Sequence, residues 1–299
     1  MNGYVHHTHC PVCGNSEINP LLTVKDFSVS GKEFVVWQCA ACSLRFTQDA
    51  PDEASIGPYY KSPDYISHTN TSKGMINKAY QAVRNYTLKQ KQQLIVSQTG
   101  VQTGAILDVG CGTGAFLAVM KKGGWKTEGI ELDSDARRLA RELNGIVARE
   151  PSVMAQLPAG SFDAITLWHV LEHVHDLHPY VERLKELLKK GGKIFIAVPN
   201  YQSLDAGIYR PYWAAYDVPR HLYHFSPRSV EVLLQKHGLK LTAKKPMWFD
   251  SFYIALLSSK YRFGSTRWIS ALFNGLRSNL TAATNKDKCS SLIYVVEKA

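Results

Sequence analysis

Apolar positions follow two different rhythms along the chain, and the change from one to the other marks strands and helices. The apolar runs at 105–109, interrupted by Asp108, and at 194–198 are typical of strands that are buried on both faces. We also expect a strand at 127–130. Between these runs, 115–120 is an apolar segment that we expect to be a helix, and in 181–188 the apolar residues recur at helical spacing. This alternation predicts an α/β domain built on a parallel sheet.

Glycine, serine and proline mark several helix ends. Gly191 and Gly192 end the helix that contains the second periodic segment. Ser226 and Pro227 have the residue types that begin a helix, and Gly238 ends it. Each of these helices is therefore bounded by residues that suit its ends.

Composition places the chain among globular proteins. Its 299 residues, 45% of them hydrophobic, are enough for one large domain with a small appendage. No apolar run approaches the roughly 18 residues that a membrane-spanning helix needs, and the N-terminal segment lacks the apolar region of a signal peptide. We therefore expect a cytoplasmic protein.

Four of the six cysteines form two pairs, each with two residues between its members. Cys10 and Cys13 make the first pair, and Cys39 and Cys42 the second. In a chain without export signals, this spacing favours Zn²⁺ held by four thiolates over disulfides, while unrelated buried cysteines are the alternative. Gly14 suits the tight turn of a metal knuckle. The metal is expected to fold a small zinc-ribbon-like module.

Charge is distributed unevenly around the overall net charge of +10. Residues 1–60 hold six acidic and three basic residues, whereas 240–288 hold nine basic and two acidic residues. Thiolates bound to zinc would make the N-terminal module still more negative, which opposes phosphate binding there. The histidines at 6, 7 and 9 are expected to be solvated.

A glycine-rich loop follows the first apolar strand. Gly110, Gly112 and Gly114 let the backbone approach a ligand, and the helix that starts there offers free amide groups. Asp108 lies within the strand, and Glu131 stands at the end of the next strand, where a carboxylate can accept hydrogen bonds from both hydroxyls of a ribose. The pattern indicates a nucleoside ligand.

This loop, with Glu131, resembles the cofactor signature of class I S-adenosylmethionine (SAM) methyltransferases. Segments 161–173 and 187–200 resemble the fourth and fifth strands of that family. Segments 59–65 and 217–226 resemble relatives of the ubiquinone-biosynthesis O-methyltransferases, with a type 11/23 methyltransferase domain.

The resemblance implies a Rossmann-like, seven-stranded methyltransferase sheet with helices on both faces, whose antiparallel last strand is 291–296. It implies these cofactor-binding residues: Asp108, Gly110, Cys111, Gly112, Gly114, Glu131, Leu132, Trp168 and His169. We expect three divisions: a zinc-ribbon-like module at 1–55, a helical linker at 56–100 and the methyltransferase domain at 101–299. The linker contains a polar helical run at 73–98. The methyltransferase domain contains a lid insertion at about 201–225 and a basic aromatic insertion at about 244–288.

Two histidine-containing clusters are candidates for catalysis, beginning with the one that follows the fourth strand. His169, Glu172 and His173 either orient the cofactor loop or form part of a divalent metal site. Glu172 and His173 resemble the end of the Glu-x-x-Glu-His metal motif of related methyltransferases, but His169 replaces the first glutamate, and imidazole suits Zn²⁺ or Fe²⁺ better than Mg²⁺.

The second cluster comprises Asp217, Arg220, His221 and His224 and follows an aromatic run in the lid segment. His221 is the first candidate for a general base and His173 the second, with His169 as a further catalytic candidate. The alternative is a structural corner in which Arg220 pairs with Asp217.

The basic aromatic insertion carries Trp268, Ile269, Leu272, Phe273 and Leu276 on one helical face. Such a face is either buried core or a surface for a membrane or an anionic acceptor, such as a lipid-linked or nucleotide sugar. The whole pattern predicts a SAM-dependent methyltransferase that acts on a small-molecule or glycan-like acceptor. The family resemblance favours oxygen as the target atom, with carbon next. The alternatives are a zinc-ribbon rRNA base methyltransferase and a non-catalytic SAM-binding protein.

Overall fold

The computed structural model describes residues 3–61 and 75–299. Its internal contacts divide the chain into two compact units. The first unit comprises Met1–Ile66, Leu171–His178 and Ala197–Tyr294, and the second comprises Ser67–Val170, Pro179–Ile196 and Val295–Ala299. Part of the motif at 59–65 and the start of the polar run at 73–98 lie outside the described residues. The predicted boundaries at residues 55 and 100 stay a prediction.

A seven-stranded sheet has the order β12-β13-β10-β9-β6-β7-β8. Strand β6 is parallel to both β7 and β9, and β7 is parallel to β8. The predicted Rossmann-like sheet is therefore confirmed, with its last strand next to the edge strand β12. The strands are β6 Ala105–Val109, β7 Lys126–Ile130, β8 Ala148–Arg149, β9 Phe162–Trp168, β10 Leu188–Pro199, β12 Leu239–Pro246 and β13 Ser291–Lys298.

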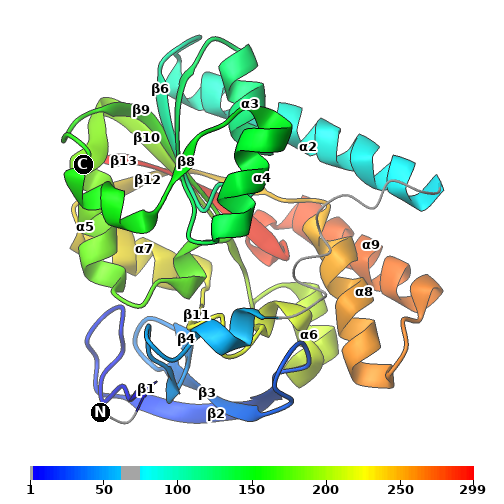
Figure 1. Ribbon diagram of the computed structural model, residues 1–299. Helices are drawn as coiled ribbons and strands as arrows, with labels where there is room; N and C mark the ends of the chain where they lie inside the picture. Colours follow the sequence, from blue (N-terminus) through cyan, green and yellow to red (C-terminus); the bar gives the residue numbers. More distant parts are fainter. Residues whose placement is uncertain (1–2, 62–74) are drawn as a thin grey trace. The chain divides into compact units, whose positions relative to one another are not determined.

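The second unit carries the glycine loop. Helix α3 follows that loop and packs against both α2 and β7 (Figure 1). Helix α4 begins where the Asp133 side chain accepts a hydrogen bond from the Ala136 amide, and it ends at Gly145 with φ of +61°. The helices of this part of the chain are α2 Met75–Thr99, α3 Ala115–Lys122, α4 Ser134–Asn144 and α5 Leu177–Leu187.

The first unit has its own four-stranded sheet in the order β11-β4-β3-β2. Strand β11 comes from the lid segment, and it pairs antiparallel with β4 through Tyr223 opposite Phe46 and His224 opposite Arg45. The strands are β2 Ile18–Lys25, β3 Glu33–Cys39, β4 Arg45–Thr47 and β11 Tyr223–His224, beside a small pair of β1 Tyr4–Val5 and β5 Ala50–Pro51.

One apolar core joins the parts of the first unit. It contains Val36 from β3, Trp213 from the lid segment, Ala255 from α8 and Ala271 from α9. Helices α8 and α9 lie side by side (Figure 1). The helices here are α6 Leu204–Tyr209, α7 Pro227–Lys236, α8 Asp250–Phe263 and α9 Trp268–Thr284.

Short 3-10 turns connect many of these elements. They are η1 Gly57–Tyr60, η2 Pro151–Gln156, η3 Leu171–His173, η4 Arg210–Tyr212, η5 Ala214–Tyr216 and η6 Lys286–Lys288. Within the described residues, the helices lack the combination of length and apolar character that a membrane span requires.

Candidate functional site

The glycine loop leads directly from β6 into α3. Gly112 has φ of +54°, and a Cβ built there would meet no atom of the described residues within 4 Å. At Gly114, where φ is +72°, a Cβ would lie 2.9 Å from the Ile146 side chain. Both backbone conformations favour glycine. The loop is therefore packed at Gly114 and open at Gly112, where a ligand can approach the backbone.

Glu131 connects the end of β7 to this loop. One carboxylate oxygen accepts a hydrogen bond from the Gly112 amide at 2.8 Å, and the other accepts one from the Asp133 amide at 3.0 Å. A carboxylate has about four acceptor positions, so two backbone donors leave capacity for ribose hydroxyls. Leu132, the next residue, is exposed.

Asp108 is buried below the loop. Its carboxylate accepts a hydrogen bond from the Thr166 hydroxyl at 2.6 Å. Burial raises the pKa of Asp108 to about 7, because the charged form loses its hydration there. The side chain is thus held inside the sheet by Thr166 of the neighbouring strand β9.

The end of β9 carries Trp168 and His169. The Trp168 ring packs edge-on against Phe116, with 5.5 Å between ring centroids, and the Lys91 ammonium lies 4.0 Å from the Trp168 ring centroid. His169 has φ of +59°, a left-handed conformation that is uncommon for residues other than glycine. The strand therefore ends in a sharp turn at His169.

Three potential ligands come together in the first unit. Glu172 and His173 lie in η3, and His221 lies in the segment before β11; one ligand atom from each is within 4.8 Å of the others. The two imidazole rings are 4.6 Å apart between centroids and nearly perpendicular. The Leu222 amide donates to the Glu172 carbonyl at 2.8 Å, which joins the two segments.

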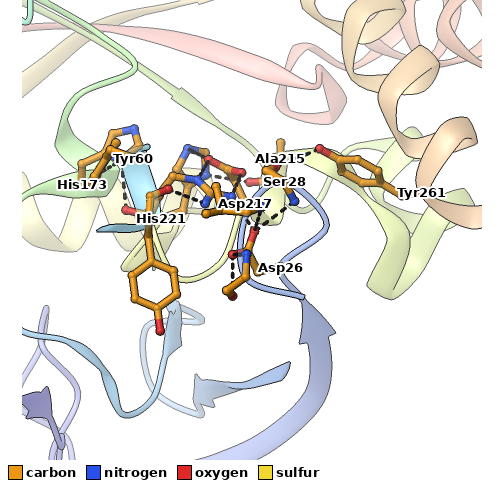
Figure 2. A network of polar contacts seen from close by, with 12 residues as sticks. Asp26, Ser28, Tyr60, His173, Ala215, Asp217, His221 and Tyr261 are labelled. Carbon is orange, nitrogen blue, oxygen red and sulfur yellow. Dashed lines mark hydrogen bonds and ion pairs between the residues drawn. The ribbon is translucent and has the colours of Figure 1, made fainter. Parts of the chain in front are cut away.

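Backbone carbonyls fix the tautomers of both histidines (Figure 2). His173 Nδ1 lies 2.9 Å from the Arg220 carbonyl oxygen, and His221 Nδ1 lies 2.8 Å from the Ala215 carbonyl oxygen. Because a carbonyl only accepts, each Nδ1 carries the proton in the neutral ring, and each Nε2 has a lone pair for a proton or a metal. Burial, together with the neighbouring His221, lowers the pKa of His173 to about 4.

A buried ion-pair network holds this segment in place (Figure 2). The Arg220 guanidinium donates to Asp217 at 2.6 Å and to Asp26 at 3.0 Å, and to the Tyr59 carbonyl at 2.9 Å. Desolvation opposes the charged guanidinium, but the two carboxylates outweigh it and raise the pKa of Arg220. The pairing of Arg220 with Asp217, which the alternative interpretation of this cluster as a structural corner predicts, is therefore present. Its second partner, Asp26, comes from the zinc-ribbon-like module.

Two further contacts join Thr47 of the zinc-ribbon-like module and Tyr60 of η1 to the two histidines. The Thr47 hydroxyl donates to the His221 carbonyl oxygen at 2.8 Å, and the Tyr60 hydroxyl lies 3.1 Å from His173 Nδ1 (Figure 2). The backbone of His221 is thus held from β4.

The four paired cysteines converge as expected. Their sulfur atoms lie within 4.8 Å of one another, with 3.5 Å between Cys10 and Cys42 and between Cys13 and Cys39. A tetrahedral site with Zn–S bonds of ~2.3 Å needs sulfur atoms ~3.8 Å apart, so the donors fit this ion. The hydrogen bond between Cys10 and Cys42 lowers the pKa of Cys10 to about 5 and raises the pKa of Cys42, so this pair readily releases one of its two protons.

The two knuckles have the same backbone geometry. Gly14 donates its amide to the Cys10 carbonyl at 2.9 Å, and Ser43 donates its amide to the Cys39 carbonyl at 3.1 Å. Gly14 has φ of +78° and Ser43 has φ of +60°. The predicted tight turn at Gly14 is confirmed, and Ser43 adopts the corresponding conformation at the second pair.

Comparison with known proteins decides the family. A methyltransferase domain model matches residues 80–244, more than half of the chain. The chain belongs to the class I SAM-dependent methyltransferases. A ubiquinone biosynthesis O-methyltransferase from Nitrosococcus oceani is 32% identical to this methyltransferase over 173 residues, which is 53% of this chain and 71% of that protein.

Two further similarities agree with this family. The protein of the same description from Xanthomonas axonopodis pv. citri is 30% identical, over 48% of this methyltransferase and 66% of its own length. Among solved structures, the magnesium protoporphyrin IX methyltransferase from Synechocystis PCC 6803 with bound SAH has a TM-score of 0.54 at 13% identity, covering 83% of this chain and 100% of that one. The latter similarity is one of fold.

The expected site residues of the methyltransferase fall into two groups. The cofactor candidates Asp108, Gly110, Cys111, Gly112, Gly114, Glu131, Leu132, Trp168 and His169 all belong to the second unit, whereas the catalytic candidates His173 and His221 belong to the first. The Cys111 amide donates to the Ile130 carbonyl at 3.0 Å, and burial raises the pKa of its thiol. The roles of all these residues stay predictions.

Sequence reasoning missed several residues around the histidines of the methyltransferase. Asp26, Thr47 and Tyr60 contact Arg220, His221 and His173 from far along the chain. They have no shared motif or spacing with the lid segment. Asp26 follows β2, Thr47 ends β4 and Tyr60 lies in η1, so the local sequence around each residue does not indicate its partner.

Proposed function

We propose that this methyltransferase transfers the methyl group of SAM to an oxygen atom of a small-molecule or glycan-like acceptor. The observation that carries the proposal is the Glu131 carboxylate bonded to the Gly112 amide beside the open side of the loop. This arrangement suits an adenosine ribose, whose hydroxyls donate to the carboxylate. The curated relatives are named as O-methyltransferases, which supports oxygen as the target atom.

In the proposed reaction, the acceptor oxygen attacks the sulfonium methyl group in line with the breaking S–CH₃ bond. The acceptor hydroxyl gives its proton to Nε2 of His221, the oxygen forms the new bond to carbon, and the S–CH₃ electron pair stays on sulfur. His221 then releases the proton to water. Holding both reactants in near-attack geometry supplies much of the rate enhancement. His173 is the second candidate for the base, and His169 is a further catalytic candidate.

Their convergence supports an alternative role for the same residues, in which Nε2 of His221 binds a metal ion and therefore does not accept the proton. Glu172, His173 and His221 offer one carboxylate and two imidazole ligands within 4.8 Å of one another. A backbone carbonyl accepts a hydrogen bond from Nδ1 of each imidazole and orients the ring, as commonly found for histidine ligands in metal sites. We propose that they hold a divalent cation such as Zn²⁺ or Fe²⁺, in addition to structural zinc at the cysteines. Such a cation, when bound, lowers the pKa of a coordinated acceptor hydroxyl.

We further propose that the acceptor is a lipid-linked or nucleotide sugar and that the protein acts in the cytoplasm, with nucleic acid a less favoured partner. The small-molecule acceptors named for structural neighbours, such as geranyl diphosphate, belong to those proteins. A peripheral membrane contact through 244–288 would suit a lipid-linked acceptor.

The decisive experiment is incubation of the zinc-loaded chain with methyl-labelled SAM and fractionated extract, because the labelled product identifies the acceptor and the target atom. Label in a small or lipid-extractable product supports the proposal, and label in RNA or no label contradicts it. Calorimetry with SAM and its demethylated product tests cofactor binding separately.

His221→Ala distinguishes the two roles of the histidine. As a base alone, its loss should lower turnover by about 10²–10⁴-fold with unchanged metal content and unchanged SAM affinity. As a metal ligand, its loss should remove the metal that exceeds the cysteine-bound zinc, and Cys289→Ala should retain that metal. Equal loss of turnover and SAM affinity would indicate neither role.

A further inference from the structure

Helix α9 has its small and polar residues facing inward. Ala271, Gly275, Ser278 and Ala282 are its buried positions. The Ser278 hydroxyl donates to the Asp205 carboxylate at 2.6 Å, and a Cβ at Gly275 would lie 2.8 Å from the Phe252 ring. The packed face of α9 is therefore specified by close backbone approach and polar contacts.

Asparagines extend this inward polar face. The Asn274 amide donates to the Tyr209 hydroxyl at 3.1 Å, and the Asn279 amide donates to the Trp248 carbonyl at 2.7 Å. Hydrogen bonds within the unit thus satisfy side chains that would lie on the solvent face of an ordinary amphipathic helix.

The large apolar residues of α9 face outward. Ile269 is 88% exposed, Leu280 61%, Phe273 59% and Trp268 58%. Leu272 and Leu276 are also exposed on the same helix. Of the two interpretations of this face in the sequence, burial in the core of the chain is therefore wrong. A contiguous exposed apolar surface of this kind marks a site of interaction.

The charges around this face are almost all positive. Residues 248–284 contain Lys260, Arg262, Arg267 and Arg277 and a single acidic residue, Asp250. The Arg267 guanidinium lies 3.8 Å from the centroid of the Phe263 ring, and the Arg277 guanidinium lies 5.8 Å from that of Phe273. Across the described ranges 3–61 and 75–299, none of these four basic side chains forms a salt bridge with an acid.

We propose that helices α8 and α9 dock on the surface of an anionic lipid bilayer. Trp268, Ile269 and Phe273 enter the boundary between headgroups and acyl chains, and Arg262, Arg267 and Arg277 contact lipid phosphates. Aromatic and aliphatic side chains on one face with arginines at its edge are typical of helices that lie in this interface. A second copy of the chain fits less well, because it would bring arginines together.

Vesicle sedimentation of the zinc-loaded full chain tests this contact. We expect binding to phosphatidylcholine vesicles that contain phosphatidylglycerol, weak binding to phosphatidylcholine alone, and loss of binding near 1 M salt, where the screening length is ~3 Å. Trp268→Ser with Phe273→Ser should weaken binding by about tenfold or more, since two interfacial side chains are lost. Arg267→Gln with Arg277→Gln should weaken it and reduce its salt dependence.

The matched control is Leu143→Ser with Val147→Ser, which removes two exposed apolar side chains from the second unit. This control should bind vesicles as the unmodified chain does. Circular dichroism and zinc content report the folding of every variant. Circular dichroism, zinc analysis and vesicle sedimentation are all done without SAM. An absence of membrane binding can therefore be distinguished from an absence of methyl transfer.

Three outcomes would overturn the proposal. They are no binding to anionic vesicles by the folded chain, binding that the α9 variants leave unchanged, and self-association or RNA binding that Trp268→Ser with Phe273→Ser removes while vesicle binding is absent.

Discussion

The glycine loop and the histidine cluster draw their parts from very different distances along the chain. The loop, its strand, its helix and Glu131 all lie within residues 105–131. The cluster takes Glu172 and His173 from one segment and His221 from another, and Asp26 and Thr47 of the N-terminal module hold the second segment. The first site therefore depends on local backbone conformation, while the second depends on long-range pairing.

Because of this difference, we expect substitutions that destabilise the first unit to lower turnover more than they lower the affinity for SAM. The largest effect is expected from Cys39→Ser with Cys42→Ser, because structural zinc contributes about 10–16 kcal/mol in small zinc-binding modules. We expect loss of zinc, loss of amide protection in β3 and β4, and loss of turnover, with SAM affinity reduced less than tenfold. Zinc analysis, hydrogen exchange and calorimetry measure these three properties.

The matched control for the cysteine pair is Cys289→Ala, which changes a buried cysteine outside the cluster and should retain zinc. If the amides of β4 stayed fully protected from hydrogen exchange in the zinc-free variant, zinc would not be needed to fold this part of the first unit. That result would contradict the dependence of the histidine cluster on long-range pairing with the N-terminal module.

The next largest effect is expected from Arg220→Leu. It leaves the carboxylates of Asp26 and Asp217 without their guanidinium partner, and breaking a buried pair in this way costs about 3–5 kcal/mol. Urea unfolding measures the loss. Arg138→Leu, which removes two exposed ion pairs on α4, should leave the unfolding midpoint nearly unchanged. An equal response of the two variants would contradict the role assigned to the network.

A smaller effect, confined to the other site, is expected from Glu131→Gln. The substitution removes the charge that strengthens hydrogen bonds with the Gly112 amide and with ribose hydroxyls. SAM affinity should fall by about 10–100-fold, since hydrogen bonds to charged groups contribute about 1.5–3 kcal/mol. Titration calorimetry measures this, with Glu128→Gln on β7 as the control. Unchanged affinity would remove the central support for the proposed cofactor site.

The smallest effects are expected from pH, with opposite signs in the two units. The Asp108 pKa of about 7 lies above its unfolded value, so its contribution to stability is present at low pH and is lost as pH rises towards 7. The His173 pKa of about 4 lies below its unfolded value, so its contribution is present above ~6.5 and is lost as pH falls towards 4.

Urea unfolding at pH 5 and pH 8 measures these contributions as differences from Asp108→Asn and His173→Gln. Between pH 8 and pH 5, each difference should change by roughly 2 kcal/mol, upwards for Asp108 and downwards for His173. If the two differences in unfolding free energy changed with the same sign, burial would not be the cause of both pKa shifts.

Sequence reasoning succeeded where one short segment determines its own conformation. The Ser226 cap is an example, because its side chain and that of Ser229 exchange hydrogen bonds with each other's backbone amides. The two cysteine knuckles and the strand–loop–helix unit around Gly112 are determined locally in the same way. In each case the residue types needed for the geometry lie within a few positions of one another.

Sequence reasoning could not predict features that depend on partners distant in the chain. Strand β11 is only two residues long, so its alternation is too short to predict pairing with β4. The exposure of the apolar face of α9 could not be predicted either. Helical periodicity shows that the apolar residues share one face, but it does not show whether that face is packed or exposed. Small residues such as Gly275 decide this, through the close approach of Phe252.

The pairing of β4 with β11 also has a consequence for synthesis of the chain. Thr47 and His224 are 177 residues apart in the sequence. At ~5–20 residues per second, the ribosome needs roughly 10–35 s to add them. Throughout that interval the nascent N-terminus has both cysteine pairs but an open strand edge, so metal capture can precede closure of the sheet and protect the edge from non-native pairing.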